Sequence, residues 1–262
     1  MSKGKYYFSK SLEKGLSILA LFNRDTPALT QSAVAKTLGL NMTSTYRYIN
    51  TLVELGYLEK DPKTKEIRPA LLSIALCTNL MRATDQLAMI EDVVDRVHRA
   101  YNISIDMAFV VNDALVRIYH REAAETLIYR LPDVSPDCLH NTALGKAYLA
   151  SLPDGQAVGK IASLTLVGRT AETITDKDRL LTEIRKARER GYAMCVEEYL
   201  PGLLAIGAPL VDALNGKGVG AVSFDFSVLQ QSPGGIVAKY AGLLKETART
   251  LSTLLPSVQP NR

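Results

Sequence analysis

The sequence predicts an α+β protein in which a small, basic, helical N-terminal segment precedes a larger domain on an antiparallel sheet. Apolar residues recur at helical spacing between residues 12 and 53. After Tyr101, short β-rich runs come in pairs, with helical patterns between and after them. Residues 1–70 carry 11 Lys/Arg against 6 Asp/Glu, a balance of +5, whereas the remainder carries 20 against 21, a balance of −1. The charge therefore separates two parts of the chain.

The composition limits the class of protein. A chain of 262 residues with 47% hydrophobic and 22% charged residues is long enough for two folded domains and is neither disordered nor collagenous. Cys77, Cys138 and Cys195 show no C-x-x-C spacing, so we expect no disulfide framework, no bound metal and a reducing, cytoplasmic location. No apolar run approaches the roughly 20 residues of a membrane span, and we expect no membrane partner and no cofactor.

Three helices are predicted in the basic segment. Leu12, Leu16, Leu19 and Phe22 form the apolar stripe of the first, which ends before Pro27. Thr30 can cap the second, and a turn containing Gly39 follows it. Asn41 can cap the third, on which Thr45, Ile49, Leu52 and Val53 share one face before Gly56 closes it.

Two helices joined by a short turn containing glycine form a helix-turn-helix, whose second helix enters the DNA major groove. Short polar side chains and one arginine lie opposite the apolar stripe of the third helix and suit contacts with base edges or phosphates. We expect DNA contacts from Thr43, Ser44, Tyr46, Arg47 and Asn50.

A β-wing is predicted directly after this helix. Residues 57–60 and 66–68 read as strands around the turn 61–65. Lys60, Lys63, Lys65 and Arg68 lie on it and are expected to neutralise phosphates. A small helical subdomain with a solvated face is the alternative, but the local basic excess favours double-stranded DNA as the partner.

The remainder reads as a helical connector and a sheet domain. Helices are predicted at 70–82, 85–101, 141–152, 156–163, 176–190 and 235–255. Strands are predicted at 103–111, 115–119, 126–130, 192–196, 203–211 and 219–226. We expect a dimer seam on the connector, since helix-turn-helix proteins commonly bind two half-sites as dimers. For residues 85–101, an ordinary packed helix of the sheet domain is the alternative.

Three blocks of residues carry a family resemblance. The first comprises Ser11–Leu19, Ala35–Leu40 and Thr45–Tyr57; the second is Leu139–Ala150; the third runs from Arg190–Tyr192 through Glu197-Glu198, Gly202 and Ala208-Pro209 to Ser223. In these blocks, which span nearly the whole chain in order, the sequence resembles the IclR family of bacterial transcription regulators.

The resemblance implies a winged helix-turn-helix at 1–70, a linker helix at 71–84 and a GAF-like domain at 85–262 that binds a small-molecule effector. It also implies a homodimer or tetramer acting as repressor or activator. By correspondence, the effector pocket falls on Cys195, Leu203, Ala205, Ser223 and Asp225, with walls around Met107 and Tyr129. Two departures concern the second wing strand, with Ile67, Pro69 and Ala70, and the loop 132–138, which lacks the usual glycine.

The effector class can be argued from the pocket residues. Ser223, Asp225 and Ser227 alternate with apolar residues and share one sheet face, which in an anonymous strand would usually meet water. The N-terminus of the helix begun at Asn141 favours a carboxylate. Because Asp225 would repel that carboxylate, we expect an effector with both an acid and a hydroxyl group, such as a hydroxylated aromatic acid.

Two other classes of function are alternatives. An enzyme with an appended DNA-binding domain lacks support, because Ser11–Lys14 matches S-x-x-K without its companion motifs and Gly216–Gly220 lacks nucleotide-loop spacing. No catalytic residues are therefore expected. An architectural DNA-binding protein would bind DNA independently of any small molecule.

Overall fold

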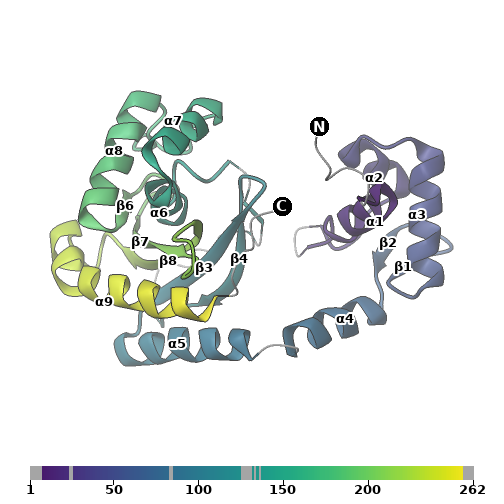
Figure 1. Cartoon of the computed structure of the whole chain (residues 1–262), viewed down its shortest axis with the longest axis horizontal. Helices are drawn as coiled ribbons and strands as arrows, with labels where there is room; N and C mark the ends of the chain where they lie inside the picture. Colours follow the sequence, from purple (N-terminus) through teal and green to yellow (C-terminus); the bar gives the residue numbers. More distant parts are fainter. Residues whose placement is uncertain are drawn as a thin grey trace. The chain divides into compact units, whose positions relative to one another are not determined.

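The computed structural model describes residues 8–23, 26–82, 85–124, 132, 134–135 and 137–255, which divide into two compact units between Asp85 and Gln86 (Figure 1). Each unit has its own hydrophobic core. Among the described residues, no helix has the length and apolar character that crossing a membrane requires.

The N-terminal unit is a winged helix-turn-helix followed by one more helix. Its elements are α1 (Lys10–Leu19), α2 (Gln31–Leu38), α3 (Met42–Glu54), β1 (Leu58–Lys60), β2 (Ile67–Pro69) and α4 (Leu71–Arg82). The predicted caps are confirmed, because Thr30 and Asn41 accept backbone hydrogen bonds from Ala33 and Ser44. Gly39 ends α2 at φ +61°, a left-handed conformation that glycine adopts without strain.

A single core holds these elements together. Every element from α1 to β2 contributes one fully buried apolar side chain; these are Ile18, Val34, Ile49, Leu58 and Ile67. The wing strands pair antiparallel over three residues each, so the second wing strand is as short as its sequence suggests. The two wing residues in the core, Leu58 and Ile67, thereby tie the wing to α3.

The C-terminal unit is a six-stranded antiparallel sheet covered by helices on both faces. Its helices are α5 (Gln86–Tyr101), α6 (Ala143–Ser151), α7 (Asp154–Ser163), α8 (Lys177–Arg190) and α9 (Pro233–Leu254). Its strands are β3 (Ser104–Val111), β4 (Ala114–Arg121), β5 (Val134–Ser135), β6 (Ala193–Val196), β7 (Leu203–Val211) and β8 (Gly218–Ser227). The described strands lie in the order β5-β4-β3-β8-β7-β6. The predicted strand at 126–130 lies outside the described residues.

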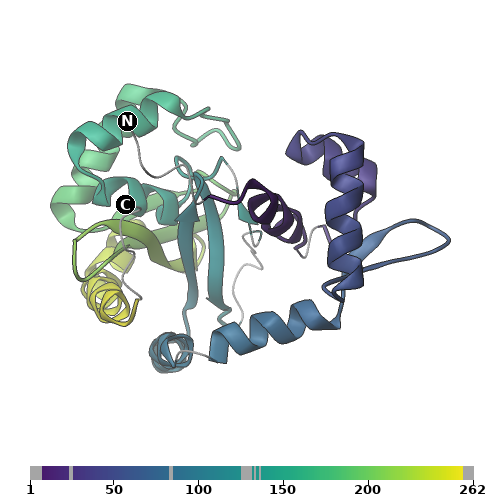
Figure 2. The same cartoon turned by 45° about the vertical axis from the view of Figure 1, so that its right-hand side comes forward.

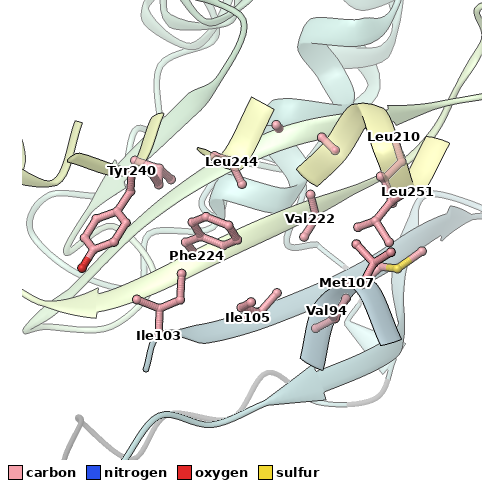
Figure 3. Close-up of a cluster of buried hydrophobic side chains, with 14 of the residues drawn as sticks. Val94, Ile103, Ile105, Met107, Leu210, Val222, Phe224, Tyr240, Leu244 and Leu251 are labelled. Carbon is pink, nitrogen blue, oxygen red and sulfur yellow. The ribbon is translucent and has the colours of Figure 1, made fainter. Parts of the chain in front are cut away.

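One face of the sheet packs against α5 and α9, which lie side by side (Figures 1 and 2). Figure 3 shows this core, in which Ile105, Met107 and Phe224 from the central strands meet Leu244 and Leu251 from α9. This contact fixes which face of the sheet each residue points to. Side chains alternate along a strand, so the residues between these apolar ones point to the opposite face.

The opposite face packs against α6, which in turn contacts α7 and α8. A Cβ at Gly207 of β7 would lie 2.5 Å from the carbonyl oxygen of Ala143, so the absent side chain lets the start of α6 rest directly on the sheet. The N-cap of α6 is Thr142 and not Asn141, because the Thr142 hydroxyl accepts the hydrogen bond from the Gly145 amide.

Candidate functional site

The third helix presents a polar face away from its core. Thr45 and Ile49 are buried, whereas Thr43, Tyr46 and Arg47 are exposed. Ser44 and Asn50 are half-buried at the edges of the same face. The predicted DNA-contacting residues of α3 therefore form one accessible surface, with the guanidinium of Arg47 available to a guanine edge or a phosphate.

The wing carries the predicted basic residues in several settings. The ammonium of Lys60 lies 5.9 Å from the centre of the Tyr46 ring, which connects the wing to α3. Lys65 donates to the Pro62 carbonyl, Arg68 forms an exposed ion pair with Glu66, and Lys63 is exposed at the turn. Surface pairs of this kind are weak and can exchange for phosphate contacts.

A second candidate site is a small, partly open cavity between the sheet and the start of α6. Its volume of about 20 Å³ holds about one water molecule. Five predicted effector residues, Cys195, Leu203, Ala205, Ser223 and Asp225, meet there. The other lining residues are Asp106, Asn141, Thr142, Ala143, Leu144, Glu198 and Tyr199.

Strand register brings these residues together. Cys195 of β6 pairs with Ala205 of β7, which pairs with Asp225 of β8. One step along the same face, Ser223 of β8 pairs with Asp106 of β3. The shared face predicted for Ser223, Asp225 and Ser227 is confirmed, and the alternative of a water-exposed face is wrong, since all three residues are buried.

Met107, predicted as a wall residue, is not among the described residues that line the cavity. Met107 packs in the opposite core near Val94 and Leu251 (Figure 3), because it follows Asp106 by one residue and alternate residues point to opposite faces. Asp106 thus takes the place expected for Met107. Tyr129 lies outside the described residues.

Two buried carboxyl groups occupy the sheet side of the cavity. The Ser223 hydroxyl donates to Oδ1 of Asp225 at 3.0 Å. Burial raises the pKa of Asp225 well above its usual range, and the neighbouring Asp106 carboxyl raises it further. Both effects favour the neutral, protonated form of Asp225 over its carboxylate.

The helix side of the cavity offers hydrogen-bond donors. The amides in the first turn of α6 have no hydrogen-bond acceptor within the helix. Among the described hydrogen bonds, the Thr142 hydroxyl accepts one from the Gly145 amide only. Ala143 and Leu144 also line the cavity, so their amides lie beside it at the positive end of the helix dipole. The carboxamide of Asn141, fully buried beside them, has no hydrogen-bond partner among the described residues.

A buried cation borders the cavity without lining it. Lys146 of α6 donates to Oε1 of Glu198, and its side chain is fully buried. Burial acts to lower the pKa of Lys146, but the Glu198 carboxylate, which accepts its hydrogen bond, helps to raise the pKa above its usual value. Burial raises the pKa of the Cys195 thiol, so Cys195 lines the cavity as a neutral group.

Sequence reasoning missed Asp106 and Glu198. The signal for Asp106 is visible in retrospect, because it is the one charged residue in the apolar run 103–111. Glu198 follows a strand and faces the cavity only because the chain turns after Val196, and no spacing indicates that.

Together, the winged helix-turn-helix and the polar cavity define a protein that joins a DNA-binding fold to a separate domain with a candidate ligand site. Residues 11–62 match the IclR helix-turn-helix domain, and residues 79–253, more than half of the chain, match the C-terminal domain of the bacterial transcriptional regulator IclR. The chain belongs to the IclR family and is a DNA-binding transcriptional regulator.

Individual relatives agree over nearly the full length. The p-hydroxybenzoate hydroxylase transcriptional activator of Acinetobacter baylyi is 27% identical, over 93% of this chain and 91% of its own. A putative IclR transcriptional regulator from Silicibacter has a TM-score of 0.81 at 19% identity, covering 95% of this chain and 98% of its own. An IclR homologue from Microbacterium hydrocarbonoxydans, solved with 4-hydroxybenzoate, has a TM-score of 0.69 at 21% identity, with 94% and 98% covered.

Proposed function

We propose that this regulator controls a catabolic operon in response to a small organic acid that carries a hydroxyl group, such as a hydroxylated aromatic acid. The observation that carries the proposal is the polar cavity, which has the first-turn amides of α6 on one side and Asp225 on the other. The solved relative that holds 4-hydroxybenzoate and the relative that activates p-hydroxybenzoate hydroxylase support the aromatic class.

The size of the cavity supports a conformational mechanism. A space of about 20 Å³ is far smaller than an aromatic acid, so effector binding requires the pocket to widen. A ligand shifts an equilibrium between two arrangements only by its difference in affinity for them. An effector that fits only the widened pocket has this property, and we propose that the widened arrangement changes DNA affinity.

In this proposal, each part of the chain has a separate role. Residues 1–70 bind the operator, the DNA sequence that the regulator recognises, and residues 71–84 link them to the effector domain at 85–262. In the cytoplasm, where bacterial DNA lies, Thr43, Ser44, Tyr46, Arg47 and Asn50 read base edges, whereas the wing residues Lys60, Lys63, Lys65 and Arg68 contact phosphates.

A second copy of the chain is proposed as the partner of an exposed apolar groove in the N-terminal unit. Leu12 and Leu16 of α1, Leu55 after α3 and Leu76 of α4 line it, and the first three expose more than half of their surface. A contiguous apolar surface of this kind marks an association site. A two-fold dimer would place two copies of α3 on two half-sites, and pairs of dimers would form a tetramer.

Calorimetric titration tests the proposed effector class. The probes are 4-hydroxybenzoate, the smaller hydroxy acid glycolate and the uncharged benzyl alcohol. We expect one of the acids to bind wild-type protein and Asp225→Ala to weaken that binding. Preference for benzyl alcohol, or unchanged affinity in Asp225→Ala, contradicts the proposal.

Two alternatives predict different results. An architectural DNA-binding protein would keep the same DNA affinity with every acid. An enzyme would convert the bound acid, which chromatography of the recovered ligand would show. We propose a regulator without catalytic residues, so the ligand should be recovered unchanged.

A further inference from the structure

Asp106 lines the cavity, although the sequence patterns did not predict it as a cavity residue. It lies in the middle of β3, directly opposite Ser223 of β8, on the face that contains Asp225. Its side chain is 1% exposed and lines the cavity. Two carboxyl groups therefore lie next to each other in one buried space.

Their surroundings assign different charges to the two groups. The Nδ1 atom of His120 lies 3.0 Å from Oδ1 of Asp106, and the guanidinium of Arg117 lies 3.9 Å from the same oxygen. Asp225 has the Ser223 hydroxyl as its described donor. Because a buried carboxylate needs a nearby cation, the negative charge is placed on Asp106 and the proton on Asp225.

The other elements around the cavity do not alter this assignment. Across the sheet, Ala205 of β7 pairs with Asp225, and Cys195 of β6, whose thiol pKa is raised by burial, pairs with Ala205 one strand further away. From α6, the ammonium of Lys146 is already paired with Glu198. The raised pKa of Asp225, caused by burial and by Asp106, agrees with the same distribution.

Unpaired polar atoms at the cavity provide an independent indication of a ligand. Among the described residues, Oδ2 of Asp106 and Oε2 of Glu198 have no hydrogen-bond donor, and both amide atoms of Asn141 have no partner. All three residues line the cavity and are more than nine-tenths buried. Since native proteins rarely leave such groups unpaired, the cavity is built for a polar ligand.

We propose that Asp106 and Asp225 form a singly protonated carboxyl pair that recognises a hydroxyl group of the effector. The ligand O–H donates to Asp106, and the carboxyl O–H of Asp225 donates to the ligand oxygen. A methyl ether accepts but cannot donate, and an ammonium donates but cannot accept, so both are disfavoured. This inference rests on the proposed function, because it assumes that an acid binds in this cavity.

The test is calorimetric titration with paired ligands that differ only at the hydroxyl oxygen: 4-hydroxybenzoate with 4-methoxybenzoate, and glycolate with methoxyacetate. For wild-type protein we expect the hydroxy acid to bind about 10- to 100-fold more tightly, as for one hydrogen bond to a charged group. Asp225→Asn should keep this preference to within about threefold, because an amide N–H replaces the carboxyl O–H. Asp106→Asn/Asp225→Asn, which removes the charge, should reduce the preference by about tenfold.

Asp95→Asn is the matched control, because Asp95 pairs with Arg121 and Tyr119 outside the cavity. It should leave the preference unchanged. If the double variant does not fold, the wild-type protein can be titrated in buffers of different ionisation enthalpy. This calorimetric measurement reports how many protons are taken up or released when the ligand binds. A pair that already holds its proton takes up none when the ligand binds.

Three results would overturn the inference. They are equal affinity for hydroxy and methoxy acids, loss of the preference in Asp225→Asn alone, and uptake of a proton on binding. Each leaves an acid-responsive regulator in place. Failure of every acid to bind instead overturns the proposed function itself.

Discussion

The ammonium of Lys146 and the carboxylate of Glu198 form an ion pair inside the C-terminal unit, 2.5 Å apart. Lys146 comes from α6, the helix whose start borders the cavity, and Glu198 is one of the residues that line the cavity. The pair therefore fixes α6 to the loop after β6. Removing one partner leaves the other charge buried without compensation.

Lys146→Met is expected to lower the free energy of unfolding by about 3–5 kcal/mol, because it leaves the Glu198 carboxylate unpaired. The double variant Lys146→Met/Glu198→Leu should recover much of that loss. Urea unfolding of the three proteins measures both changes. A loss below about 1 kcal/mol in the single variant would show that the pair does not hold the helix.

Arg47→Ala is expected to weaken operator binding by about tenfold or more, because it removes a contact with a base edge or phosphate from α3. The measurement is fluorescence anisotropy on a DNA sequence selected by the wild-type protein from a random pool. Lys63→Ala should weaken specific and non-specific binding alike and reduce the salt slope by about 1. Lys217→Ala, an exposed lysine of the C-terminal unit, is the control. Unchanged affinity in both variants would refute the helix and wing assignments.

Leu16→Glu is expected to dissociate the proposed dimer, because it places a charge in the apolar groove between α1 and α4. Light scattering after size-exclusion chromatography measures the mass at several concentrations. Leu229→Glu is the matched control, because Leu229 is 91% exposed and lies in the C-terminal unit. A Leu16→Glu protein with the wild-type mass would exclude this groove as the interface.

The raised pKa of Asp225 makes stability depend on pH. Between its unfolded-state value of about 3.9 and its higher folded-state value, the folded protein binds more protons than the unfolded chain, so stability decreases as the pH rises. Asp225→Asn removes this penalty, because an amide does not titrate. The stability of the variant relative to wild type should thus increase from pH 4 to pH 8 in urea unfolding. A difference that does not change with pH contradicts the proton assignment.

Local sequence signals predicted the N-terminal unit well. Thr30 and Asn41 cap their helices as expected, and Gly39 adopts the left-handed conformation that its turn requires. Helix caps and turns depend on residues within about four positions of each other, so they can be predicted from the local sequence. The burial of Ile49 also follows from helical spacing.

The effector cavity was predictable only in part. Ser223 and Asp225 share a face because strand residues alternate between two faces. Their place in the pocket was predicted from the resemblance to the IclR family. Asp106 and Met107 are adjacent in β3 and point to opposite faces, so Asp106 lines the cavity whereas Met107 lies in the opposite core. Which face each residue points to depends on pairing between β3 and β8, more than 100 residues apart in the chain, which no local pattern reveals.

The central claim is that an acid bound in the effector cavity changes the affinity of the protein for DNA. Its most direct test is fluorescence anisotropy with the selected DNA, in the absence and presence of a saturating acid from the calorimetric panel. The account predicts a change in dissociation constant of about fivefold or more, within the usual range of allosteric coupling. A dissociation constant that stays the same while calorimetry shows the acid bound would contradict it.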